Sequence, residues 1–117
     1  MSETGHEVLD AIRSRRSIRQ YSDDPVSDDK VRAILEAGRW APSGLNNQPW
    51  RFGVVRDPEC KNTISELTRY REIIRNAPVI IAVFMDNDTG YDRVKDCQSI
   101  GACLQNMWLA THTLGLG

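Results

Sequence analysis

The segment from Trp40 to Trp50, with the sequence WAPSGLNNQPW, constrains the fold more than any other part of the chain. Its prolines, Pro42 and Pro49, fix φ, lack a backbone N–H and disfavour helix at the residue before them, so the segment should form a stiff, irregular loop. Between them lie a hydroxyl and three side-chain amides that can donate and accept hydrogen bonds. Gly44 can adopt a positive φ or let another molecule approach the backbone. The loop is therefore either a surface turn, in which these residues are common, or a binding site.

Helices and strands flank this loop. Apolar residues at helical spacing predict helices over Glu7–Ser14, from Asp28 to about Trp40, from Pro58 through Leu67, over Tyr70–Asn76 and over Arg93–Leu114. Short β-rich apolar runs predict strands over Arg51–Arg56 and Val79–Met85. Ser27 and Asp57 are expected to cap the helices that follow them, and Gly115 to end the last helix.

The residue patterns of two of these elements predict how they pack. The seven apolar residues of Val79–Met85 show no alternation, which predicts a strand buried on both faces at the centre of a sheet. Helix Arg93–Leu114 is apolar nearly all round, and a domain of 117 residues can hardly cover such a helix alone. We therefore expect it to form a subunit interface. His112 should be a hydrogen-bonded residue of that interface, with a role as an acid as the alternative.

A cluster of arginines follows the first predicted helix. Four of them fall within seven residues: Arg13, Arg15, Arg16 and Arg19. A solvated helix C-terminus, which the macrodipole favours, explains the first two but leaves Arg19 unexplained. Because the planar guanidinium suits bidentate phosphate binding, the cluster also fits a single anion site.

Composition limits the classes of function. A chain of 117 residues, 40% of them hydrophobic, suits one globular domain or a piece of one, and a net charge of −1 argues against nucleic acid or an acidic membrane surface as a partner. Three cysteines without C-x-x-C spacing and the lack of a signal peptide lead us to expect a cytoplasmic protein. With only two histidines, we expect neither a metal site nor a catalytic triad, and Ser43 is not expected to be a nucleophile.

Three stretches resemble the nitroreductase family of FMN-dependent oxidoreductases. They are RRSIRQY at 15–21, APSGLNNQPW at 41–50 and the end of the last helix at 101–117. The resemblance covers essentially the whole chain. It implies that residues 1–117 belong to a single α+β domain with a mainly antiparallel sheet flanked by helices, in an intertwined homodimer with two FMN sites at the interface. Family members continue beyond the position of Gly115–Gly117, so we expect a further C-terminal part.

The resemblance also implies the residues of the FMN site. Arg15, Arg16 and Ser17 would contact the phosphate and ribityl chain, and Arg19 would reach the pyrimidine side of the ring. Four loop residues would approach the flavin from the partner subunit: Pro42, Ser43, Gly44 and Asn46. Where some relatives supply an Asn and a Lys to the pyrimidine ring, this chain has Tyr70 and Arg71.

The function implied is that of an FMN-dependent reductase. NADH or NADPH would donate hydride to flavin N5 and be replaced by a small-molecule acceptor such as a nitroaromatic or a quinone, in a ping-pong scheme. The flavin would carry the chemistry, so no side chain is expected to be catalytic itself. The alternative is a non-catalytic anion-binding or dimerisation module that uses the same arginines without flavin.

Overall fold

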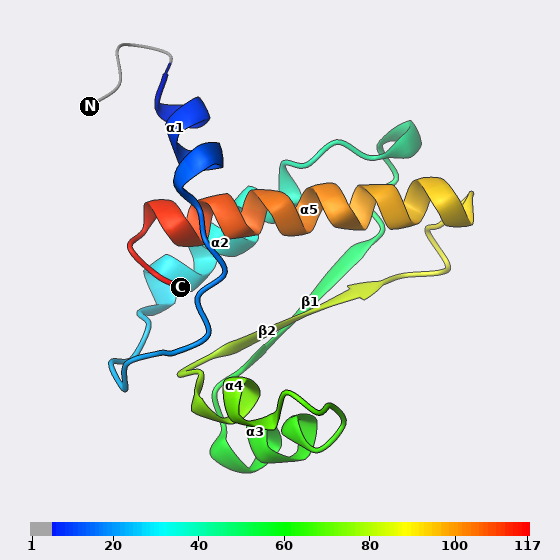
Figure 1. The fold of residues 1–117 in the computed structure, drawn as a ribbon. Helices are drawn as coiled ribbons and strands as arrows, with labels where there is room; N and C mark the ends of the chain where they lie inside the picture. Colours follow the sequence, from blue (N-terminus) through cyan, green and yellow to red (C-terminus); the bar gives the residue numbers. More distant parts are fainter. Residues whose placement is uncertain (1–5) are drawn as a thin grey trace.

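The computed structural model describes residues 6–117, which form an α+β arrangement of helices around a small antiparallel sheet (Figure 1). In chain order the elements are α1 (Glu7–Ser14), α2 (Asp28–Arg39), the 3-10 turn η1 (Gly44–Asn46), β1 (Trp50–Val55), α3 (Pro58–Ser65), α4 (Arg71–Asn76), β2 (Ile80–Met85) and α5 (Arg93–Thr113). Every predicted helix and strand is present, most within one residue of the predicted bounds. The exception is α3, which ends at Ser65 and leaves Leu67 84% exposed instead of on its apolar face.

Local capping explains where the helices begin and end. Ser27 accepts a hydrogen bond from the Lys30 N–H at 3.3 Å, and Asp57 accepts one from the Cys60 N–H at 2.8 Å, which confirms both predicted N-caps. Helix α5 ends at Thr113, and the predicted terminating glycine, Gly115, follows the C-cap residue Leu114 with a φ of 78°, which is readily available to glycine. The Leu116 N–H then donates to the Thr111 carbonyl at 3.0 Å, which satisfies one of the last carbonyls of the helix.

The core lies where α2 crosses α5. Gly38 permits the close approach, because a Cβ there would lie 2.9 Å from Met107 Cγ and 3.0 Å from Cys103 Sγ. The buried cluster consists of Ile34, Ala41, Trp50, Cys103 and Met107. Because Trp50 belongs to this cluster and directly follows the fully buried Pro49, the loop at 42–49 leaves the core at one end and returns to it at the other.

The sheet has two antiparallel strands, with Trp50 opposite Met85 and Val55 opposite Ile80. The prediction that Val79–Met85 is buried on both faces at the centre of a sheet is wrong for this chain. No residue of β2 is fully buried, and Phe84 is 58% exposed. An apolar strand is covered on both faces only when packed layers lie on both sides, and here α5 contacts β2 while β1 is the only strand paired with it among residues 6–117.

The remaining helices lie at the two ends of this arrangement. Helices α3 and α4 pack against each other at one end of the sheet, and α1 contacts α5 near its C-terminal half (Figure 1). None of the helices within residues 6–117 is long and apolar enough to cross a membrane.

Candidate functional site

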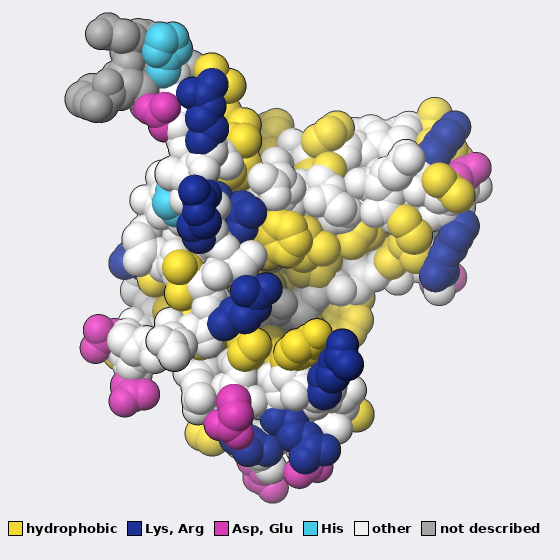
Figure 2. Space-filling view, viewed as in Figure 1, with side chains coloured by type: hydrophobic (Ala, Val, Ile, Leu, Met, Phe, Trp, Pro, Cys, Tyr) yellow, Lys and Arg dark blue, Asp and Glu magenta, His cyan; other side chains and the backbone are white. Residues whose placement is uncertain are grey.

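A cleft of about 820 Å³ lies between the arginine segment, β2 and the second half of α5. Its size falls in the range of about 300–1,000 Å³ that is common for sites of small ligands and cofactors. Figure 2 shows hydrophobic side chains within the hollow beneath α5 and Lys and Arg side chains along its rim. The predicted phosphate, ribityl and ring contacts all line this cleft: Arg15, Arg16, Ser17 and Arg19.

The arginines of this cleft are not neutralised by carboxylates. Within residues 6–117, no ion pair involves Arg15, Arg16 or Arg19. Lys30 adds a fourth cation to the lining, and Asp24 is the one acidic side chain of residues 6–117 that lines it. Such an excess of positive charge favours an anionic ligand.

The three guanidinium groups differ in how they are held. Arg15 lies over the Trp108 ring, 6.0 Å from its centroid. Arg16 Nη1 donates to the carbonyl oxygens of Arg13 at 2.7 Å and Arg15 at 2.8 Å. Arg19 is exposed and has no hydrogen bond or ion pair to any residue of the described chain. Arg13 lies in the last turn of α1 and Arg15 is its C-cap residue, so the helix macrodipole explains these two and leaves Arg19, beyond the end of the helix, unexplained, as predicted.

His112 is hydrogen-bonded, as predicted. Its Nε2 lies 2.8 Å from Ser14 Oγ, and the Ser14 hydroxyl donates its only proton to the Asp10 carbonyl at 2.6 Å. The imidazole N–H at Nε2 is therefore the donor in the contact between His112 and Ser14. This bond fixes the end of α1 against α5 beside the arginine segment; its place in a subunit interface stays a prediction.

The loop at 42–49 has a strained backbone, but not where the sequence suggested. Gly44 does not take a positive φ; instead Leu45, Asn46 and Gln48 do, at 53°, 55° and 49°. The left-handed region costs on the order of 1 kcal/mol for each non-glycine residue. Glycine is needed at position 44 for another reason, because a Cβ there would collide with the Tyr91 ring.

Contacts from α5 hold this loop in place. The Gly44 N–H donates to Ser99 Oγ at 3.3 Å, and Asn47 Nδ2 donates to Asp96 Oδ1 at 2.9 Å. The same Nδ2 donates to the Thr89 carbonyl at 3.0 Å, which joins the loop to the segment after β2. The sequence did not single out Asp96 and Ser99; the one signal was that these polar residues share the face of α5 that also holds Cys103 and Met107.

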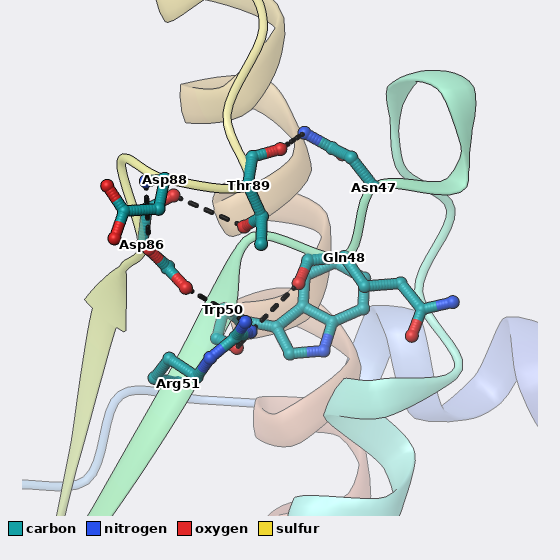
Figure 3. Close-up of polar contacts among 7 residues, drawn as sticks. All are labelled: Asn47, Gln48, Trp50, Arg51, Asp86, Asp88 and Thr89. Atoms are coloured by element: carbon teal, nitrogen blue, oxygen red, sulfur yellow. Dashed lines mark hydrogen bonds and ion pairs between the residues drawn. The ribbon is translucent and has the colours of Figure 1, made fainter.

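A second set of contacts joins the same two segments at the end of the sheet (Figure 3). Arg51 pairs with Asp86 at 2.9 Å and donates to the carbonyl oxygens of Trp50 and Gln48 at 2.7 and 3.2 Å. The Asp86 N–H in turn donates to the Pro49 carbonyl at 2.7 Å. The loop at 42–49 and the segment at 86–92 therefore form one connected unit.

This chain does not bring the two halves of the predicted site together. Ser99, which binds the loop, and Trp108, which lies under Arg15, are nine residues apart on α5. Nine residues are two and a half helical turns, so the two side chains leave opposite sides of the helix, about 13 Å apart along its axis. Tyr70 and Arg71 do not line the cleft. Neither do the four loop residues predicted to approach the flavin, which are Pro42, Ser43, Gly44 and Asn46.

Fold and cleft together define an α+β protein with a basic, cofactor-sized site and no group of side chains within residues 6–117 that could hold a metal ion. Residues 12–117 match the model of the nitroreductase family. The chain therefore belongs to the nitroreductase family.

Relatives agree with this assignment. A "putative nitroreductase in complex with FMN" from Desulfovibrio desulfuricans is 58% identical, with a TM-score of 0.90 over 95% of this chain and 65% of that chain. A "putative NADH dehydrogenase/NAD(P)H nitroreductase" from Methanothermobacter thermautotrophicus is 42% identical over 95% of this chain, and an "FMN reductase [NAD(P)H]" from Bacillus subtilis is 38% identical over 69% of it. This chain spans 58% of the Methanothermobacter protein and 32% of the Bacillus protein.

Proposed function

We propose that the protein is an FMN-dependent oxidoreductase that passes hydride from NADH or NADPH, through the flavin, to a small-molecule acceptor such as a nitroaromatic or a quinone. One observation carries the proposal: three arginines without carboxylate partners in the described chain line a cofactor-sized cleft in a member of the nitroreductase family. The relatives described above, one in complex with FMN and one named an FMN reductase, support the same cofactor.

The residues of the cleft fit FMN. Arg15 and Arg16 would bind the phosphate, because both guanidinium groups are held at the cleft and neither is paired with a carboxylate of the described chain. Ser17 would bind the ribityl chain. The bound flavin would supply the redox chemistry, taking hydride at N5. Arg19, exposed and unpaired in the described chain, would provide positive charge at the pyrimidine side, where reduction adds negative charge.

The proposal includes a homodimer in which the loop at 42–49 of one subunit completes the cleft of the other. Support comes from where the two sites lie on α5: the loop is bound at Asp96 and Ser99 near its start, and the cleft is lined by residues of its second half. A loop that does not reach the cleft of its own chain could reach the cleft of a partner subunit. A second support is the face of α5 opposite its buried residues, which remains largely uncovered and consists of Val94, Cys97, Gly101, Leu104 and Trp108. An apolar face of this kind favours association. A cytoplasmic location, expected from the cysteines of the sequence, is part of the same proposal.

Titration with FMN tests the proposal. The purified protein should bind about one FMN per chain, followed by the visible absorption and fluorescence of the flavin, and the complex should oxidise NADH or NADPH when an acceptor is present. Arg15→Ala should weaken FMN binding about tenfold to a hundredfold, because a hydrogen bond to a charged group contributes about 1.5–3 kcal/mol. Arg75→Ala is the matched control, since Arg75 lies on α4 and pairs with Glu72 at 3.1 Å. A protein that binds inorganic phosphate at the arginines but no flavin would instead be the anion-binding module.

A further inference from the structure

Asp96 is a buried carboxylate near the start of α5, with only 5% of its surface exposed. None of the ion pairs formed among residues 6–117 involves it. Its Oδ1 accepts from Asn47 Nδ2 at 2.9 Å, and its Oδ2 accepts from the Tyr91 N–H at 3.1 Å. A buried carboxylate without a cation is costly, so these two bonds and the positive end of the helix dipole must offset its desolvation.

The two bonds reach different segments. Asn47 belongs to the loop at 42–49, and Tyr91 belongs to the segment after β2. The Tyr91 ring lies so close to Gly44 that a Cβ there would collide with it, and Lys95 Nζ lies 5.7 Å from the centroid of the same ring. Asp96 is therefore the point where both segments are attached to the core helix.

Asn47 has a buried side-chain oxygen, Oδ1, without a hydrogen-bond partner among the described residues. The side chain is therefore oriented only by what its Nδ2 donates to Asp96 and to the Thr89 carbonyl. Most buried polar atoms have partners, and those that do not are often found where function imposes the geometry. Its neighbours Leu45, Asn46 and Gln48 all have positive φ, a region that leucine and glutamine rarely adopt unless the surrounding structure holds them there.

We propose that Asp96 is the positioning residue of the 42–49 loop. Through Asn47 and Tyr91 it holds the loop, with Leu45, Asn46 and Gln48 at positive φ, in the conformation that binds a ligand. The identity of the ligand as a flavin rests on the proposed function. The role of Asp96 in fixing the loop is independent of it. The role is preorganisation, because a loop already held in its binding conformation loses less conformational entropy when the ligand binds.

Hydrogen exchange of the protein without cofactor tests the positioning directly. Asp96→Asn keeps the shape but places an amide donor against either Asn47 Nδ2 or the Tyr91 N–H. We expect the amides of residues 44–48 to exchange about tenfold to a hundredfold faster than in the wild type, while amides of the α2–α5 core are unchanged. Asn47→Ala, which removes the donor from the loop side and leaves the core intact, should have the same effect. Asp29→Asn is the control, because that side chain is 96% exposed.

FMN binding supplies the functional readout. If the flavin contacts this loop, Asp96→Asn and Asn47→Ala should weaken FMN binding and change the visible circular dichroism of the bound flavin, and Asp29→Asn should do neither. A wild-type protein that binds no FMN would refute the proposed function and leave the exchange experiment to decide the role of Asp96. Exchange that is unchanged at residues 44–48, or raised uniformly throughout the chain, would overturn the positioning role.

Discussion

The guanidinium carbon of Arg15 lies 6.0 Å from the centre of the Trp108 ring. Arg15 lies beyond the end of α1, in a segment without regular secondary structure, and Trp108 lies on the largely uncovered face of α5 with 52% of its surface exposed. The indole thus provides a fixed surface for a side chain that would otherwise be free to rotate. Together with the bond between His112 and Ser14, this contact attaches the arginine segment to the core helix.

Trp108→Ala should weaken FMN binding modestly. A cation–π contact at a partly exposed site contributes about 0.5–1 kcal/mol, so the dissociation constant should rise about twofold to fivefold, well below the effect of Arg15→Ala. Fluorescence titration measures the change. Trp108→Phe, which keeps a ring under the guanidinium, should recover most of the affinity; equal affinities for the wild type and Trp108→Ala would show that the contact does not position Arg15.

Arg19→Ala should separate the two roles assigned to the arginines. Flavin should still bind, since the phosphate contacts remain, but its reduction potential should fall because the charge on the reduced ring loses its counter-ion. For a two-electron couple each 1.4 kcal/mol corresponds to about 30 mV, so we expect a decrease of tens of millivolts and slower reduction by NADH or NADPH. Potentiometry and stopped-flow absorbance measure both. A potential and rate equal to those of the wild type would place Arg19 away from the ring.

Val94→Glu should weaken the proposed dimer. Val94 is 65% exposed on the uncovered face of α5, and a carboxylate buried there between two subunits would lose its hydration. Sedimentation should show a wild-type dimer and a shift toward monomer of tenfold or more, on the order expected for a disrupted interface residue. Leu67→Glu, at an exposed apolar side chain outside α5, is the control and should sediment as the wild type does. A wild-type protein that stays monomeric would refute this interface.

Cys103 should make stability fall at alkaline pH. Burial raises the pKa of its thiol above the ordinary value of 9.0. Above that pH the unfolded thiol ionises while the folded one keeps its proton, so the unfolded state binds fewer protons and the free energy of unfolding decreases as pH rises toward the folded pKa. The contribution of this thiol to stability is thus fully present below pH 9.0.

Urea denaturation between pH 8 and 10 measures this effect. The slope due to one thiol can reach about 1.4 kcal/mol per pH unit, and it should be absent from Cys103→Ala. Cys60→Ala, at an exposed cysteine, should keep the wild-type slope. Identical slopes for the wild type and Cys103→Ala would contradict the prediction.

The sequence predicted those features that depend on interactions between residues close together in the chain. The N-caps of Ser27 and Asp57 act on amides three residues away, and Gly115 ends α5 through bonds within its last turn, so each can be read from a few neighbouring residues. The arginine segment was also recognisable, because four guanidinium groups in seven residues need explanation wherever the chain places them. That three of these arginines, Arg15, Arg16 and Arg19, line one cleft required the fold.

Sequence alone determined the order and type of the elements, the caps and the composition of the two segments proposed to bind the cofactor. Only the tertiary structure decided that Asp96 meets Asn47, 49 positions earlier, that the 42–49 loop and the cleft lie at different parts of α5, and that β2 is not covered on both faces. It also placed the positive φ angles on Leu45, Asn46 and Gln48 rather than on Gly44. The physical reason is that burial and long-range hydrogen bonds depend on which surfaces meet, and a local pattern specifies only which face of an element is apolar.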